Sequence, residues 1–308
     1  MINWFPTTQR KVTALFSSVA LIVGLSASPA WAGDPFRDSN PRDIGNNTEA
    51  AFQSIFQEGD YKEAKLYLQQ AESTEAGEPL VYAMLASLAY TERDWDSLNR
   101  YAAKTMETAQ QLTTEDPLRG NLYIAVGHFL EGAYKFEKDG PLSTLSKLQK
   151  VFQALEEAEK IDKQDPELNL VKGYMDLMLA VNLPFSDPAD AVEKLETYAS
   201  PSYLAYRGIA VGYRDLEKYT EAMEFVERTL ALTPNNPEVL YLKAQIFVEQ
   251  DKYKESLEYF KQALAQEAKL PNYSVAQIVY EQCKAQEKFD SVDRDCRAER
   301  NKIRERDN

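Results

Sequence analysis

The sequence predicts an all-α chain built from about seven antiparallel helical hairpins. Three observations favour this fold. Apolar residues recur at the i, i+3, i+4, i+7 spacing of helices, no convincing strand run follows residue 45, and aromatic residues recur 34 positions apart. The hydrophobic share of 44% is enough for a folded core. A length of 308 residues would otherwise suggest about two globular domains, but that expectation fails for repeat arrays.

The first 32 residues have the three parts of a secretory signal peptide. Arg10 and Lys11 precede an apolar run at 14–25, and Ala30-Trp31-Ala32 supplies a small-x-small cleavage site. The run is short for a membrane span, which needs roughly 20 apolar residues, so an uncleaved anchor is the weaker alternative. We therefore expect export to the periplasm or the thylakoid lumen. Loss of Arg10 and Lys11 would take the net charge from −14 to −16.

Residues 33–45 predict a flexible lead-in to the helices. They contain Pro35 and Pro41, many turn-forming residues and no apolar periodicity. The helical array then occupies residues 46–308. No stretch after residue 32 approaches the length of a membrane span, so we expect no membrane insertion once the signal peptide is removed.

The clearest repeat is the block 203–236. Tyr206, Ile209, Ala210 and Tyr213 share one face of a first helix, and a turn at 215–219 leads to a second helix that ends near Pro234. The block recurs at 237–270, and two turn aromatics near the N-terminus have the same 34-residue spacing. The matching pairs are Ala210 and Ala244, Tyr213 and Phe247, Tyr219 and Tyr253, Ala222 and Ser256, Leu230 and Leu264, and Tyr61 and Trp95.

These features resemble the tetratricopeptide repeat (TPR), a 34-residue helix–turn–helix unit with small residues at the helix crossing and an aromatic after the turn. The resemblance is good over 203–270 and fair over 46–112. It implies a right-handed superhelix in which each hairpin buries its apolar face only against neighbouring hairpins. The chain as a whole is similar to exported bacterial TPR proteins of unassigned role, cyanobacterial ones among them.

The middle of the chain, 115–200, departs from the repeat. Two longer helices are expected at 118–137 and 142–161, and a further hairpin at 166–182 and 188–199. These elements are either lengthened repeats or an inserted helical pair. An apolar stripe predicts the buried face of the helix at 142–161. Its members are Leu142, Leu145, Leu148, Phe152 and Leu155.

Residues 272–308 predict a C-terminal capping hairpin that turns near Lys288-Phe289. Its last helix mixes basic and acidic residues, which is typical of a polar outer cap, and a basic docking tail is the alternative. Cys283 and Cys296 are the only cysteines, and export favours a disulfide. In the repeat register the two cysteines would be offset by about 10 Å along the helix axis, which is too far for a disulfide. A later turn, near Phe289-Asp290, would bring them within reach. Both possibilities stay open.

Composition excludes several classes of function. The chain has 49 acidic against 35 basic residues, which argues against nucleic-acid binding. One histidine and two cysteines leave almost nothing for a metal site, and the common hydrolase, metalloprotease and phosphate-binding motifs are absent. We expect no cofactor, no metal and no enzymatic activity, and His128 is interpreted as a packing residue.

The TPR resemblance implies a partner in the concave groove, which the first helix of each repeat lines. By position, the groove residues would be Arg207, Arg214, Tyr241, Gln245 and Tyr90. Arg207 and Arg214 lie two turns apart, so both could meet an acidic ligand, and the tyrosines offer amphipathic contact area. The alternative is that these are ordinary solvated or inter-repeat positions.

The resulting hypothesis is an exported scaffold or adaptor that binds a protein or peptide, for example during assembly of an envelope or lumenal complex. The alternative is a helical carbohydrate-binding protein or hydrolase that uses groove carboxylates.

Overall fold

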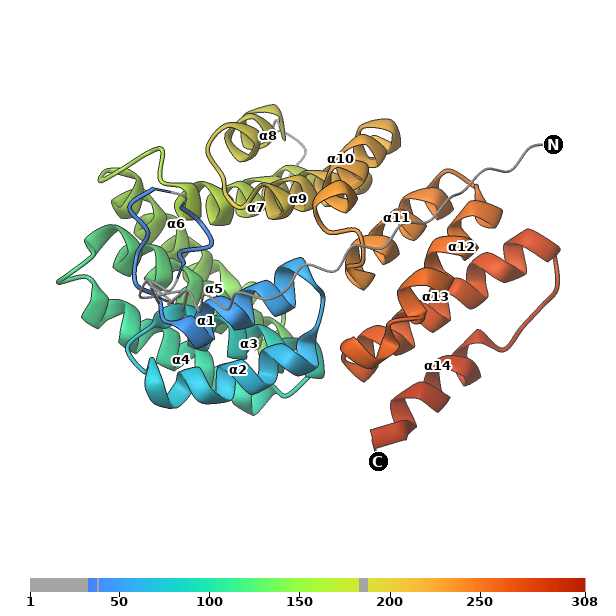
Figure 1. Cartoon of the computed structure of the whole chain (residues 1–308), viewed down its shortest axis with the longest axis horizontal. Helices are drawn as coiled ribbons and strands as arrows, with labels where there is room; N and C mark the ends of the chain where they lie inside the picture. Colours follow the sequence, from blue (N-terminus) through green and yellow to red (C-terminus); the bar gives the residue numbers. More distant parts are fainter. Residues whose placement is uncertain (1–32, 38, 183–187, 308) are drawn as a thin grey trace, which may run out of the picture. The chain divides into compact units, whose positions relative to one another are not determined.

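The computed structural model describes residues 33–37, 39–182 and 188–307. The predicted signal peptide, 1–32, lies outside the described residues. Every regular element of the described part is helical, and none of its helices is both long and apolar enough to cross a membrane. The α-helices, coloured along the chain in Figure 1, are α1 (Asn46–Phe52), α2 (Tyr61–Thr74), α3 (Pro79–Glu92), α4 (Trp95–Leu112), α5 (Pro117–Asp139), α6 (Leu145–Glu159), α7 (Pro166–Asn182), α8 (Pro188–Thr197), α9 (Ser202–Asp215), α10 (Tyr219–Leu232), α11 (Pro237–Glu249), α12 (Tyr253–Leu264), α13 (Asn272–Asp290) and α14 (Cys296–Arg304).

These fourteen helices of the described part pack in consecutive pairs, from α1 with α2 to α13 with α14. The pairing confirms the all-α fold and its array of helical hairpins. Odd-numbered helices also contact one another. For example, α3 contacts α5, and α9 contacts both α7 and α11. The odd-numbered helices are called the first helices below, and the even-numbered ones the second helices.

The 34-residue period has a backbone counterpart in the turns between paired helices. Gly59, Arg93, Glu217 and Asp251 have φ angles of 67°, 59°, 60° and 57°. Two residues after each of them a second helix begins at an aromatic residue, namely Tyr61, Trp95, Tyr219 and Tyr253. Three of the four turn residues are not glycine, although the left-handed region favours glycine.

Small residues at the helix crossings are buried as predicted. Ala210, Ala222, Ala244 and Ser256 are all 0% exposed. Because these side chains are short, the two helices of each hairpin can approach closely, and larger side chains beside them fill the core. In the block 203–236, for example, the ring of Phe225 lies 5.8 Å from that of Tyr213.

The middle helices lie close to their expected positions, but the buried face of α6 matches the predicted apolar stripe only in part. Leu145, in the predicted stripe, is 63% exposed. Leu155 of the stripe is buried and Leu148 and Phe152 are half-buried, while the other buried residues of α6 are Val151, Ala154 and Ala158. The stripe was wrong at Leu145, because a 3₁₀ turn at Pro141–Thr144 precedes α6 and offsets its first turn from the helical period expected from residue 142.

The segment 33–45 differs from the flexible lead-in that its composition predicts. Phe36 and Ile44 are buried, and the Phe36 ring packs on that of Phe52 at 5.0 Å. Arg37 and Arg42 pair with acidic residues at the starts of α5 and α7. Local composition could not show these ionic anchors, because the acidic partners lie 74 to 128 residues away in the sequence.

Arg37 and Arg42 belong to a larger buried ionic cluster. Three helices, α3, α5 and α7, begin here with acidic side chains that accept backbone hydrogen bonds. The helix N-termini carry partial positive charge, which helps to offset an excess of carboxylates over guanidinium groups. The charged members are Asp34, Arg37, Arg42, Glu78, Asp116, Arg119, Asp165 and Glu167.

The C-terminal hairpin turns later than expected. Helix α13 continues to Asp290, and the turn occupies residues 291–295 in place of the predicted hinge at Lys288-Phe289. The later turn brings the Cα atoms of Cys283 and Cys296 to 5.5 Å, and a disulfide joins them. The bridge therefore fixes the end of α13 to the first residue of α14.

Helices far apart in the sequence also contact each other, which a strictly nearest-neighbour array would not show. The Asn236 side chain donates to the backbone carbonyls of Phe56 and Gln57, both at 3.2 Å. The Tyr61 hydroxyl donates to Glu238 at 2.7 Å. The second hairpin reaches the last one too, since Arg93 donates to the Tyr273 hydroxyl at 2.5 Å.

Candidate functional site

The first helices form two cavities that include four of the five predicted groove residues. Tyr90 and Tyr241 line a cavity of about 300 Å³. Arg214 and Gln245 line a second cavity of about 460 Å³. Arg207 lines neither cavity, but its guanidinium pairs at 3.0 Å with Glu238, which lines the first.

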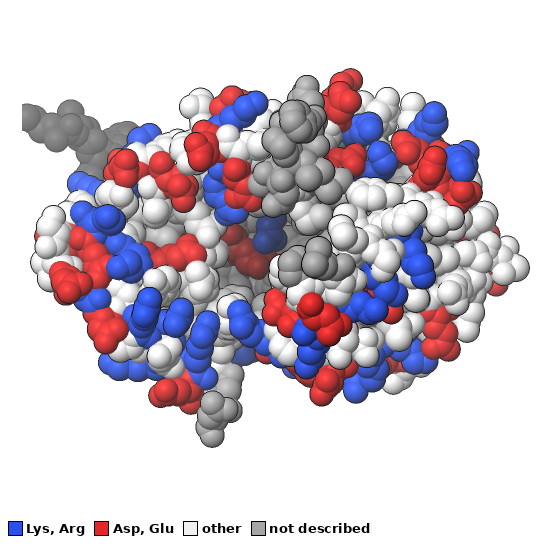
Figure 2. Space-filling view, turned by 180° about the vertical axis from the view of Figure 1, so that it is seen from behind, with Lys and Arg blue, Asp and Glu red and all other residues white. Residues whose placement is uncertain are grey.

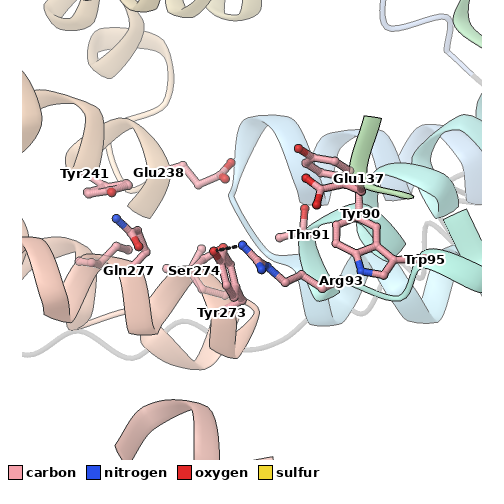
Figure 3. Close-up of a pocket in the computed structure, with 12 residues that line it drawn as sticks. Tyr90, Thr91, Arg93, Trp95, Glu137, Glu238, Tyr241, Tyr273, Ser274 and Gln277 are labelled. Carbon is pink, nitrogen blue, oxygen red and sulfur yellow. Dashed lines mark hydrogen bonds between the residues drawn. The ribbon is translucent and has the colours of Figure 1, made fainter. Parts of the chain in front are cut away.

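The first cavity lies between helices that are distant in the sequence. Figure 3 shows residues of α11 and α13 on one side of it and residues from α3 to α5 on the other. The aromatic rings of Tyr90 and Trp95 meet edge to face at 5.7 Å. The lining consists of Tyr90, Thr91, Arg93, Trp95, Glu137, Glu238, Tyr241, Leu270, Tyr273, Ser274, Gln277 and Ile278.

Glu238 is the charged group that connects this cavity to the core. Its carboxylate accepts a hydrogen bond from the Tyr61 hydroxyl and pairs with Arg207. Burial and the negative charge of Glu238 raise the pKa of Tyr61 well above its usual value, so the hydroxyl stays protonated as the donor. Burial opposes the charged form of Arg207, but Glu238, Tyr174 and Tyr61 together outweigh it and raise the pKa of the guanidinium. Arg207 is therefore a permanent cation held by the chain itself.

A chain of polar side chains crosses the second cavity from α9 to α13. Arg214 donates to the Gln245 side-chain carbonyl at 2.6 Å, and the Gln245 amide donates to Glu281 at 3.0 Å. Arg214 also pairs with Asp215 at 2.7 Å. The two arginines that were expected to meet an acidic ligand together thus each hold an acidic residue of their own chain. Burial, followed by the charge of Glu281, raises the pKa of Tyr241 on the same helix as Gln245.

Sequence reasoning missed much of the first cavity. Arg93 was not singled out from the sequence, and Glu137 and Tyr273 lie where the repeat register is irregular or unmatched. Trp95 was identified from the period, but as a turn aromatic only. The contact between α3 and α13 could not be read from a 34-residue period, because the period describes neighbouring repeats.

Exposed apolar side chains are concentrated on the first helices of the described chain. Of the twelve large hydrophobic residues found exposed there, six lie on first helices and three on second helices. Exposed apolar patches mark candidate binding surfaces, so the first helices are the better candidates for contact with a partner. The six are Tyr90, Phe129, Phe136, Tyr174, Met178 and Phe289.

His128, interpreted as a packing residue, is half-buried on α5. Its Nδ1 lies 3.3 Å from a carboxylate oxygen of Glu131, which also pairs with Lys147 at 2.5 Å. Burial, together with the nearby Lys147 and Lys150, lowers the pKa of His128. Across the residues that the structure describes, His, Cys, Asp and Glu do not gather in threes that could hold a metal ion.

Comparison with known proteins finds a family match over part of the chain. No curated protein matches the chain. Residues 213–278, which run from the end of α9 into α13, match the tetratricopeptide repeat. The match covers the turn aromatics Tyr219 and Tyr253 and the part of the second cavity that α9, α11 and α12 line, and it overlaps most of the blocks 203–236 and 237–270.

Proposed function

We propose that this protein is an exported TPR scaffold that holds a protein partner against its first helices during assembly of an envelope or lumenal complex. The observation that carries the proposal is the position of the two cavities. Both are built mainly from first helices, the set of helices that also carries six of the exposed apolar side chains, one of which, Tyr90, lines the first cavity. The TPR match over 213–278 supports a role in protein binding.

The chemistry of the first cavity suits a peptide or a protein surface. Tyrosine and tryptophan combine a large apolar area with a polar edge and lose little conformational entropy on binding. Tyr90, Trp95 and Tyr241 supply such area, while Arg93, Glu137 and Gln277 supply polar groups around them. A mixed lining of this kind is typical of the anchor points at protein interfaces.

Export is supported by two independent features. The sequence of residues 1–32 has the parts of a signal peptide. The disulfide between Cys283 and Cys296 fits an oxidising compartment, because cytosolic thiols are usually kept reduced.

Site-specific photocrosslinking in living cells tests the proposal. A photoreactive phenylalanine analogue replaces Tyr90 or Phe129 on first helices, and Leu66 or Leu232 on second helices as matched exposed controls. We expect one protein to be captured from both first-helix positions and from neither control. Equal capture at all four positions, or capture from the second helices alone, would contradict binding on the first helices.

A further inference from the structure

Most arginines of the described chain are neutralised by the chain itself. Acidic and basic side chains are interspersed over the face shown in Figure 2. Of the thirteen described arginines, eight pair with carboxylates of described residues. The five without such a pair are Arg93, Arg100, Arg297, Arg300 and Arg304.

Three of these five arginines converge on two tyrosines of α13. The guanidinium carbons of Arg93 and Arg304 lie 4.4 and 4.8 Å from the centre of the Tyr273 ring. That of Arg300 lies 5.2 Å from the Tyr280 ring. Tyr273 and Tyr280 are two turns apart on α13, and Arg300 and Arg304 are one turn apart on α14, so the groups form a strip along the last hairpin. Arg93, Arg300 and Arg304 are called the arginine strip below.

The arginine strip has unsatisfied polar groups. The Nε atoms of Arg300 and Arg304 are buried and lack a hydrogen-bond partner among the described residues. A buried donor without a partner costs free energy, and so does a set of like charges held close together. Stacking on the tyrosines offsets part of that cost, since an arginine over an aromatic face is attracted to it. A negatively charged ligand at the accessible guanidinium nitrogens would offset the repulsion between the charges.

The position of the strip indicates what kind of anion it would meet. Arg93 and Tyr273 also line the first cavity, so the strip continues the surface proposed above for a protein partner. Guanidinium groups bind carboxylates through paired, charge-assisted hydrogen bonds. Glu267, in the turn before α13, pairs at 3.5 Å with Arg306, which lies outside the strip.

We propose that Arg93, Arg300 and Arg304 bind an acidic peptide segment of the protein partner through its Asp and Glu carboxylates. The proposal rests on the scaffold function and adds the charge of the segment that is recognised. The interspersed acids and bases elsewhere make this strip a local exception in a protein of net charge −14. Positive charge without a partner on an acidic protein favours an acidic ligand by charge complementarity.

Fluorescence anisotropy with a fluorescein-labelled oligoglutamate peptide tests the proposal on the full disulfide-bonded chain. R93Q and the double variant R300Q/R304Q should each weaken binding about tenfold, the effect of losing roughly one charge-assisted contact. Two matched controls should bind like the wild type. R100Q removes an arginine that also stacks on a tyrosine, Tyr101, but lies outside the strip, and R297Q removes an exposed arginine of α14.

Three results would overturn the proposal: no binding of the oligoglutamate, equal weakening by the control variants, or tighter strip-dependent binding of a DNA oligonucleotide, which would make the strip a general polyanion site. Unchanged thermal melting of each variant shows that folding is intact. Failure of the scaffold function is distinguishable, because it would abolish capture at Tyr90 and Phe129 while strip-dependent binding of the oligoglutamate persists.

Discussion

The guanidinium of Arg119 donates to both carboxylate oxygens of Glu78, at 2.6 and 2.7 Å. Its Nε donates to Glu167 at 3.0 Å, so one buried cation joins the starts of α3 and α7 to that of α5. We predict that R119M unfolds at lower denaturant concentration, with a loss of about 3 kcal/mol or more, because two buried carboxylates lose their partner. Urea titration followed by circular dichroism measures the loss. K104A, which breaks the exposed pair with Glu107, should stay near wild-type stability.

The single histidine gives a clean test of pH dependence. Burial lowers the pKa of His128 in the folded chain, whereas the unfolded chain titrates near 6.5. The unfolded state therefore binds more protons between the two pKa values, and stability must fall as the pH drops from about 6.5 through the folded pKa. NMR titration of the His128 ring resonances should give a pKa below 6.5. H128Q should lack this part of the pH dependence, and an unchanged pH profile in H128Q would contradict the assignment.

The disulfide should stabilise the last hairpin in particular. Cys283 and Cys296 are 13 residues apart, and closing a loop of that size contributes about 3 kcal/mol. We expect C283S/C296S to lose amide-exchange protection in α14 first, while α2 to α10 keep theirs. Loss of protection throughout the chain at once would show that the hairpin does not unfold independently. Because the bridge holds α14 on α13, the same variant should also weaken binding of oligoglutamate.

Cleavage after Ala32 would create an α-amino group at Gly33. The Gly33 nitrogen already donates to Glu49 at 2.7 Å. In the mature protein the same contact would be an ion pair, so Glu49 should raise the pKa of the amino group above its usual value near 7.7–8.0. N-terminal sequencing should find Gly33 first, and pH-dependent acylation of the amine reports its pKa. E49Q is the matched control, and an equal pKa in E49Q and the wild type would rule out the pair.

The local units of the fold could be predicted from the sequence because they repeat. Tyr219 and Tyr253 marked the starts of second helices, and Ala210 and Ser256 marked the crossings, since each acts within one hairpin or its neighbour. The anchoring of residues 33–45 could not be predicted, because Arg42 finds Glu167 only after three hairpins have stacked between them. The late turn after Asp290 was missed for a different reason, as the capping hairpin has no further repeat to impose its register.

The sequence predicted which helices carry the residues of the candidate site, but not which of these residues contact one another. The repeat pattern placed Tyr90, Tyr241, Arg214 and Gln245 on first helices, and all four line cavities. It could not show that Arg207 and Arg214 are paired within the chain. Nor could it bring Arg93 beside Tyr273, which is 180 residues away. Such contacts depend on how distant hairpins meet, and a period carries no information on that.

The central claim is that a partner binds on the first helices, and the affinity of the crosslinked partner for substituted scaffolds tests it most directly. Calorimetric titration compares Y90A and Y241A with L66A and L232A, which remove exposed side chains of second helices. If the tyrosines anchor the partner, Y90A and Y241A should each weaken binding by about 2 kcal/mol, roughly thirtyfold, and the controls should leave it unchanged. Wild-type affinity in both tyrosine variants, or an equal loss in all four, would contradict the account.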